Sequence, residues 1–224
     1  MKLLIATRNP HKLEEIKAIF PLPGLHLVSA LDFPDLPDVV EDGLTLEANA
    51  IKKAREWHAA TGLPALADDT GLEVDALGGQ PGVWSARYAG EPVDYHANNR
   101  KLLHELQHAP TRTARFRSIL ALAGLSATIL TVEGRVEGTM ATAPRGTHGF
   151  GYDPLFIPEG HTRTFAEMTG PEKNQLSHRA RALAAAHRAW LPLLSPPRSP
   201  CRGESPKTRS PMSPDLQHPP SSSS

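Results

Sequence analysis

Apolar residues at regular spacing predict a strand and then a helix at the start of the chain. The run Lys2–Thr7 is apolar enough for a short strand. The apolar positions that follow recur every three or four residues, as on one face of a helix: Leu13, Ile16, Ile19 and Phe20. The chain therefore opens with a strand, a polar turn and an amphipathic helix.

A second helix and a second strand are expected after a polar loop. Leu44–Thr61 carries apolar residues along one helical face and is followed by Gly-Leu-Pro at 62–64, a helix-ending sequence. Ala65–Ala67 then predicts a short strand that ends at two adjacent carboxylates, Asp68 and Asp69.

In the second half of the chain, predicted helices and strands alternate less regularly. Asp94–Leu106 predicts a helix, Ala114–Leu125 and Thr128–Glu133 predict two strands, Gly138–Met140 is expected to begin a third, and Leu176–Leu193 predicts a closing helix. Because helices and strands alternate early and strands cluster in the middle, we expect an α/β fold with a mixed sheet.

A change of composition at residue 195 predicts the domain boundary. More than half of residues 195–224 are Pro or Ser, and large apolar side chains are nearly absent. Such a segment buries too little surface to offset its ordering entropy, so we expect a disordered tail. Its scattered basic residues leave contact with a polyanion as a second interpretation. The catalytic or binding domain is then 1–194.

Charge and cysteine content narrow the function classes. The 224 residues include 24 Lys plus Arg and 24 Asp plus Glu, so the formal net charge is zero and gives no global case for nucleic-acid binding. The single cysteine, Cys201, excludes an intramolecular disulfide and a multi-cysteine zinc site. The apolar run at the N-terminus is too short for a signal peptide or a membrane span. We expect a cytoplasmic protein without a membrane partner.

The adjacent carboxylates Asp68 and Asp69 are followed by Thr70 and Gly71. Taken alone, such a pair is more often a plain turn, since Asp and Gly both favour turns. At a strand end, the same pair can hold a magnesium ion and activate water. Other residues of the chain are needed to choose between these two interpretations.

A polar turn separates the first strand from the first helix: Thr7, Arg8, Asn9, Pro10, His11 and Lys12. Free amides at a helix N-terminus can bind phosphate, and Lys12 adds a positive charge. The segment lacks the glycines of a Walker A loop. An Asn-Pro turn that caps the helix is the alternative, and the two interpretations are compatible.

Three further segments carry candidate chemistry. Glu41 precedes a helix that carries Asn49 and Lys53 four residues apart on one face, although surface pairs are the commoner meaning of such spacing. The glycine-rich loop Gly146–Pro154 offers aromatic faces on which a base can stack, or it is a buried turn. The stretch Gly78–Gly90 fits either the wall of a site or an interface.

The entry to the last helix is rich in cations. Ser177 or Asn174 can cap this helix, which places His178 and Arg179 in its first turn and Lys173 beside its start. Cations near the positive end of a helix are electrostatically unfavourable, which indicates a purpose other than stability. A negatively charged or carbonyl-bearing ligand would suit them.

Several motifs in order resemble the inosine triphosphate pyrophosphatase family, the pyrophosphatases of non-canonical purine triphosphates such as dITP and XTP. The matching stretches are TRNPHK, LADDTGLEVDALGGQPGVWSARYAG, GFGYDPLF and EKNQLSHRARAL, and the likeness covers residues 1 to about 193. It implies an elongated mixed sheet flanked by helices, with an active site in a cleft between two lobes.

The resemblance also implies an activity. Members hydrolyse ITP, dITP or XTP to the monophosphate and pyrophosphate with Mg²⁺, which cleanses the nucleotide pool before DNA and RNA synthesis. A homodimer is expected. Left open are a related pyrophosphatase for other modified or pyrimidine triphosphates and a nucleotide-binding regulator without turnover. The carboxylates argue against the regulator, because a pure binder gains from fewer negative charges beside a triphosphate.

The resemblance assigns roles residue by residue. Asp69 is the expected general base and a metal ligand, Glu41 a second metal ligand, and Asp68 a support. The substrate-binding residues it implies are Thr7, Arg8, Asn9, Pro10, His11, Lys12, Lys53, Thr70, Phe150, Gly151, Tyr152, Asp153, Lys173, His178 and Arg179. Arg179 donates hydrogen bonds only, so it suits the six-position carbonyl of hypoxanthine and opposes the amine of adenine. How guanine is excluded is not evident from the sequence.

Overall fold

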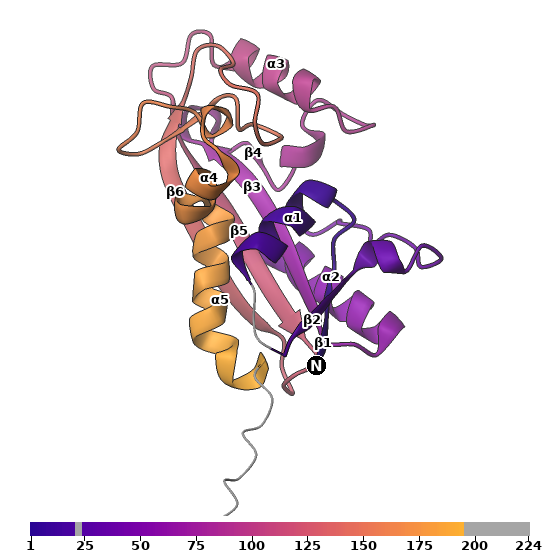
Figure 1. The fold of residues 1–224 in the computed structure, drawn as a ribbon. Coiled ribbons are helices and arrows are strands. Elements are labelled where there is room, and N and C mark those ends of the chain that lie inside the picture. The colour runs from indigo at the N-terminus through magenta and orange to yellow at the C-terminus, as the bar shows by residue number, and fades with distance from the viewer. Residues whose placement is uncertain (21–23, 195–224) are drawn as a thin grey trace, which may run out of the picture.

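The computed structural model describes residues 1–20 and 24–194, in which seven strands form one sheet (Figure 1). The strands are β1 Lys2–Ile5, β2 His26–Ser29, β3 Ala65–Val74, β4 Pro81–Gly82, β5 Thr113–Ala123, β6 Leu130–Met140 and β7 Phe156–Pro158. The helices are α1 Pro10–Ile19, α2 Leu46–Thr61, α3 Tyr95–Glu105, α4 Gly170–Leu176 and α5 His178–Leu194. The predicted tail at 195–224 lies outside the described residues.

The sheet is mixed, as predicted. Its order is β2-β1-β3-β5-β6-β7, with β4 paired to β3. β1 runs parallel to β2 and β3, whereas β3, β5, β6 and β7 follow one another antiparallel. Connections through α1 and α2 join the parallel strands β1, β2 and β3, and the long strands β5 and β6 extend the sheet into a second lobe.

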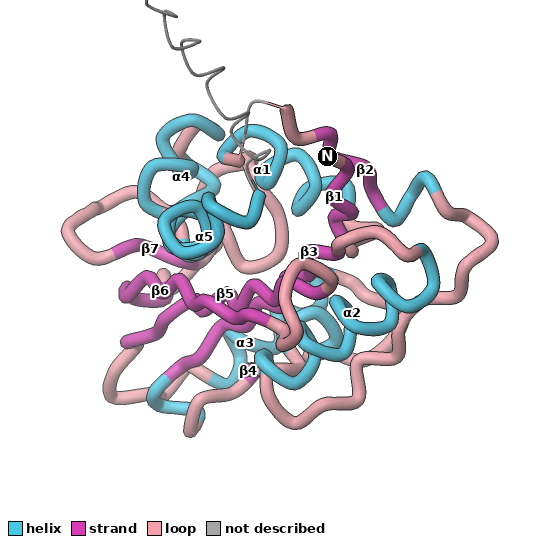
Figure 2. Tube along the Cα trace, turned by 90° about the horizontal axis from the view of Figure 1, so that it is seen from below, coloured by secondary structure: helices cyan, strands magenta, loops and turns pink. Residues whose placement is uncertain are grey.

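Helices cover both faces of the sheet (Figure 2). α1 and α5 lie on one face and α2 on the other. Side chains of β3 pack against the helices on both faces of the sheet, because successive side chains of a strand point to opposite faces. Leu66 packs with the α1 and α5 side, while Ala65 and Ala67 pack with α2.

A third apolar cluster fills the second lobe. It joins the far end of β3 and β5 to α3 and to the segment around β7, with Phe116, Phe156 and Phe165 in contact at its centre. In residues 1–20 and 24–194 no helix is long and apolar enough to cross a membrane.

Two sequence predictions about strands were wrong. β3 does not end at Asp68 and Asp69 but continues to Val74, because it pairs with β5 without interruption from Ala65 to Val74. Gly138–Met140 does not begin a strand, since these residues complete β6. Helices α1, α2, α3 and α5 were predicted to within a few residues, whereas α4 Gly170–Leu176 was not predicted. Asp94 caps α3 by accepting hydrogen bonds from two backbone amides.

Candidate active site

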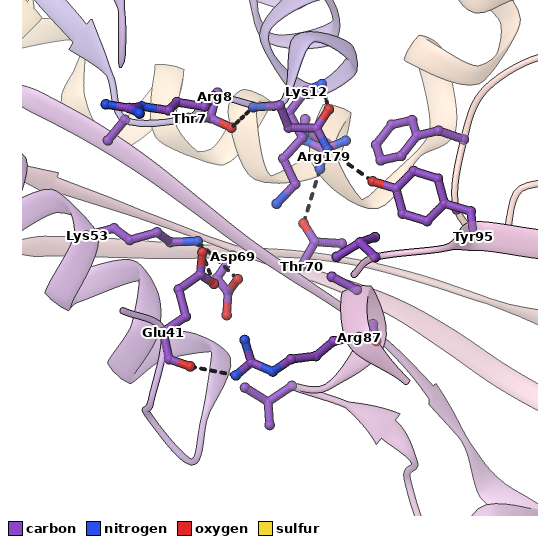
Figure 3. Close-up of a pocket in the computed structure, with 18 of the residues that line it drawn as sticks. Thr7, Arg8, Lys12, Glu41, Lys53, Asp69, Thr70, Arg87, Tyr95 and Arg179 are labelled. Atoms are coloured by element: carbon purple, nitrogen blue, oxygen red, sulfur yellow. Dashed lines mark hydrogen bonds and ion pairs between the residues drawn. The ribbon is translucent and has the colours of Figure 1, made fainter. Parts of the chain in front are cut away.

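A gap in the pairing of β3 locates the site. On one edge, β1 pairs with β3 only as far as Leu66, and the pairing with β4 begins at Leu72 of β3. Within the described chain no strand covers that edge between 67 and 71, so groups from both faces of the sheet reach one space. A cavity of about 780 Å³ opens there, between the lobe of β1 and α2 and the lobe of β4 and α3 (Figure 3).

Asp68 lies on the α1 and α5 face and is fully engaged. Its Oδ1 accepts from the Lys12 Nζ at 2.9 Å, and its Oδ2 accepts from the Arg179 Nε at 2.9 Å. The hydroxyls of Thr70 and Ser118 donate to it at 2.9 and 3.2 Å. Although burial alone would raise it, the Arg179 and Lys12 charges hold the Asp68 pKa well below its usual range. Asp68 is therefore a fixed anion that organises its neighbours.

Asp69 lies on the opposite face, toward α2. Its Oδ1 accepts from the Lys53 Nζ at 3.1 Å, and the same ammonium lies 3.1 Å from Glu41 Oε2 and donates to the Asp68 carbonyl at 2.7 Å. Burial raises the pKa of Asp69 to about 6, against the lowering effect of Lys53 and Lys12, and Glu41 adds to the rise. Asp69 is thus ionised at neutral pH but close to its proton-accepting range.

The carboxylates of Asp69 and Glu41 fit a hard divalent cation. Asp69 Oδ2 is buried and has no hydrogen-bond partner among the described residues, which is costly unless something binds it. The described part of the chain contains no group of three metal-ligating side chains. Mg²⁺ commonly takes one or two carboxylates and completes its shell with water and substrate phosphates, so two protein ligands suffice.

The turn before α1 caps the helix. Asn9 Oδ1 accepts from the amides of His11 at 3.0 Å and Lys12 at 3.3 Å, and Pro10 opens the helix. The capping interpretation therefore holds locally, and these amides already have a partner. Thr7, Asn9 and Lys12 line the cavity, whereas Pro10 and His11 do not. His11 lines a neighbouring cavity of about 540 Å³.

Arg8 is turned toward the loop that carries Glu41. Its Nη2 donates to the carbonyls of Phe33, at 3.1 Å, and Leu36, and its Nε lies 3.2 Å from Asp38. These contacts anchor the loop to the turn before α1. The guanidinium of Arg8 thus has protein partners, although the residue also lines the cavity.

An aromatic wall stands at the other end of the cavity. The Phe150 ring stacks on His11 with centroids 5.1 Å apart, and Tyr95 lies 6.0 Å away. The Tyr152 hydroxyl instead donates to the Ser85 carbonyl at 2.9 Å, and its side chain is buried. Phe150 is therefore the aromatic face that is placed to meet a base, while Tyr152 joins two segments of the wall.

Buried ion pairs connect this wall to Asp68. Lys173 Nζ lies 2.6 Å from Asp153 and 2.7 Å from Glu15, and Glu15 also pairs with Arg179. Burial alone would lower the Lys173 pKa, but Asp153 and Glu15 raise it. Sequence reasoning missed Glu15, although it follows Lys12 by three residues on α1 and so shares its helix face.

His178 and Arg179 are buried at the start of α5, where the Ser177 hydroxyl accepts from the Ala180 amide and caps the helix. Burial, with the nearby Arg179 and Lys173 charges, holds the His178 pKa well below its usual range, so the ring is neutral. The ring stacks on Phe116 at 4.6 Å, and its Nδ1 has no partner in the residues described. Arg179 also donates to Thr70 at 3.2 Å.

Nearly all the predicted residues line one cavity. Those brought together are Thr7, Arg8, Asn9, Lys12, Glu41, Lys53, Asp69, Thr70, Phe150, Gly151, Tyr152, Asp153, Lys173, His178 and Arg179. Sequence reasoning did not single out several others that line it, including Trp57, Arg87 and Tyr95. The open question about 78–90 is answered in part, since Ser85–Arg87 forms part of the cavity wall.

Comparison with known proteins gives consistent matches. A sequence model of the Ham1 family matches residues 3–189. A dITP/XTP pyrophosphatase from Geobacter sulfurreducens is 51% identical over 193 residues, covering 84% of this chain and 97% of that protein. A dITP/XTP pyrophosphatase from Porphyromonas gingivalis is 52% identical over 185 residues, covering 82% and 94%.

Solved structures similar to this chain come from proteins of the same kind. The Coxiella burnetii HAM1 protein superposes with a TM-score of 0.79 at 38% identity and covers 86% of this chain and 99% of its own. A nucleoside-triphosphatase, or dITP/XTP pyrophosphatase, from Mycobacterium abscessus gives a TM-score of 0.69 at 48% identity, with 83% and 98% covered. These likenesses confirm the predicted α/β fold with a mixed central sheet.

Proposed function

This chain belongs to the Ham1 family, and from that premise we propose that it hydrolyses dITP, ITP and XTP to the nucleoside monophosphate and pyrophosphate. Such an enzyme removes deaminated purine nucleotides before they enter DNA and RNA. The observation that carries the proposal is the buried Asp69 Oδ2, which has no hydrogen-bond partner in residues 1–20 and 24–194 and lies beside Glu41 and Lys53 in a cavity large enough for a nucleotide.

Asp69 and Glu41 would hold a divalent cation, which we propose is Mg²⁺. When bound, the ion offsets the negative charge of the phosphates. Lys53 holds both carboxylates in position through its ammonium, and its pKa is raised by them although burial alone would lower it. Lys53 thus stays charged and orients the pair.

Asp69 is the proposed general base. With a pKa of about 6 it is ionised at neutral pH, yet it accepts a proton more readily than an exposed carboxylate does. A water molecule beside Asp69 would lose its proton to the carboxylate as its oxygen attacks the α-phosphorus. Asp68 cannot share this role, because four donors already engage its oxygens.

His178 and Arg179 are proposed to read the purine beside Phe150. Arg179 has five N–H groups, of which Asp68, Glu15 and Thr70 occupy four and leave one on Nη1. A carbonyl at the six position can accept from such a donor, whereas an amine cannot. Leaving a buried donor unpaired costs about 1–3 kcal/mol, which disfavours ATP.

The proposal is tested with a panel of nucleoside triphosphates and Mg²⁺, in an assay that resolves pyrophosphate from orthophosphate. We expect pyrophosphate from ITP, dITP and XTP and much slower turnover of ATP and GTP. Equal rates on ITP and ATP, or release of orthophosphate alone, would refute it. Preference for a pyrimidine triphosphate would favour the related pyrophosphatase instead.

We also propose a homodimer, which the family resemblance implies, and a cytoplasmic location. Light scattering on the purified full chain tests the dimer, for which we expect about twice the mass of 24.2 kDa. A mass equal to one chain at micromolar concentration would contradict it.

A further inference from the structure

One of the cations that line the cavity differs from the others, because it has no carboxylate partner in the part of the chain that the structure describes. Six cationic side chains line the cavity: Arg8, Lys12, Lys53, Arg87, Lys173 and Arg179. All of them except Arg87 form at least one ion pair with Asp or Glu within 4.0 Å in the described chain. Arg87 therefore brings a positive charge that a bound anion can neutralise.

The guanidinium of Arg87 is held in place but keeps most of its donors. One of its five N–H groups, on Nη2, donates to the Glu41 carbonyl at 2.7 Å. The remaining N–H groups have no protein acceptor among residues 1–20 and 24–194. The group also lies 4.6 Å from the centre of the Trp84 ring, a stacking contact that restricts its orientation. Figure 3 shows it directed from Ser85–Arg87 toward Glu41 and Asp69.

The position of Arg87 along the cavity indicates which part of a nucleotide it meets. Glu41, Lys53 and Asp69 form one connected group, and Arg87 joins it through the Glu41 carbonyl. The base-reading group around Arg179 and Phe150 is linked instead to Asp68, Glu15 and Lys173. Arg87 therefore belongs to the end of the cavity that holds Asp69, where the attack on the α-phosphorus is proposed to occur.

We propose that Arg87 binds the two phosphate groups that leave as pyrophosphate, an inference that rests on the proposed function. As the water oxygen bonds to the α-phosphorus, the bond from that phosphorus to the bridging oxygen breaks. Its electron pair stays on the bridging oxygen, which becomes part of pyrophosphate, and the water proton passes to Asp69. A planar guanidinium matches two phosphate oxygens and stabilises the charge that develops on the leaving group.

The test compares product inhibition in R87Q, R87K and a matched control, R188Q, whose arginine is exposed on α5 outside the cavity. Inorganic pyrophosphate and IMP are used as separate inhibitors at saturating Mg²⁺. We expect R87Q to weaken pyrophosphate inhibition about tenfold, the effect of one charged hydrogen bond, and R87K to lie between R87Q and wild type. IMP inhibition should change less than about twofold in either variant, and R188Q should match wild type.

A purely structural role would give a different result. If Arg87 only holds the loop at Glu41, R87Q would raise the metal concentration needed for half-maximal activity while pyrophosphate inhibition at saturating metal stayed unchanged. That outcome, or an equal loss of pyrophosphate and IMP inhibition, would overturn the proposal. Titration calorimetry of magnesium pyrophosphate into wild type and R87Q measures the affinity for pyrophosphate without turnover. This test of Arg87 therefore remains valid even if ITP proves not to be a substrate.

Discussion

Asp68 and Asp69 are consecutive on β3, yet their carboxylates lie on opposite faces of the sheet. Asp68 meets Lys12 and Arg179 from α1 and α5, and Asp69 meets Lys53 from α2. The alternation of side chains along a strand makes this separation unavoidable. One carboxylate is saturated with donors and the other keeps an oxygen open, so the two residues are suited to different tasks.

Replacing Asp68 by Asn should destabilise the fold. The change removes a buried anion and leaves Lys12 and Arg179 without their shared partner, which costs about 3–5 kcal/mol of unfolding free energy. Urea unfolding followed by circular dichroism measures the loss. D42N is the control, because Asp42 pairs with Lys52 at the exposed surface and should remain near wild type. Equal stability of D68N and wild type would remove Asp68 from its organising role.

Replacing Asp69 by Asn should stabilise the metal-free protein at alkaline pH. The folded-state pKa of about 6 lies above the ordinary value of 3.8, so wild type loses stability as the pH rises between these values. D69N avoids that loss, which we place on the order of 1–3 kcal/mol at pH 8. Thermal unfolding in EDTA should show a higher Tm for D69N at about pH 8 and no difference near pH 4. A lower Tm at pH 8 would contradict this account of Asp69.

Replacing Glu15 by Gln should weaken discrimination between ITP and ATP. Glu15 pairs with both Lys173 and Arg179, and the loss of its charge frees the guanidinium that is proposed to read the purine. We expect the ratio of kcat/KM for ITP over ATP to fall about tenfold, equivalent to one charged hydrogen bond. E14Q is the matched control, since the neighbouring Glu14 is exposed. Unchanged selectivity in E15Q would place purine recognition elsewhere.

Removing divalent metal should stop turnover without unfolding the chain. Lys53 pairs with both Asp69 and Glu41, so we expect the two carboxylates to stay in place without the ion. EDTA should abolish pyrophosphate release while the circular dichroism spectrum stays unchanged, and added Mg²⁺ should restore activity. E41Q should need roughly tenfold more Mg²⁺ for half-maximal rate. Full activity in EDTA would contradict the metal site.

The sequence predicted much of the fold because its signals are local. Helices α1, α2, α3 and α5 were visible in apolar spacing, and Ser177, one of the two predicted capping residues, caps α5. The continuation of β3 past Asp69 was not predictable, because it depends on pairing with β5 some fifty residues later. A carboxylate pair that looks like a turn is stable within a strand only when distant cations meet it.

The site was predicted as a set of residues but not as an arrangement. Ordered motifs placed Lys53, Asp69 and Arg179 in one site by resemblance, and all three line one cavity. The residues with which they form ion pairs and hydrogen bonds are brought close by tertiary folding, which local sequence patterns do not predict. Glu15 links α1 to α4 and α5, and Arg8 turns to the loop before Glu41 rather than to the cavity alone.

The most direct test of the division between Asp68 and Asp69 is the turnover of D69N with ITP and Mg²⁺. The account predicts that pyrophosphate release falls at least about 100-fold, as expected for loss of a general base. Binding of a non-hydrolysable ITP analogue, measured in parallel by calorimetry, should stay within about tenfold of wild type. A D69N enzyme that binds the analogue and releases pyrophosphate at the wild-type rate would contradict the central claim.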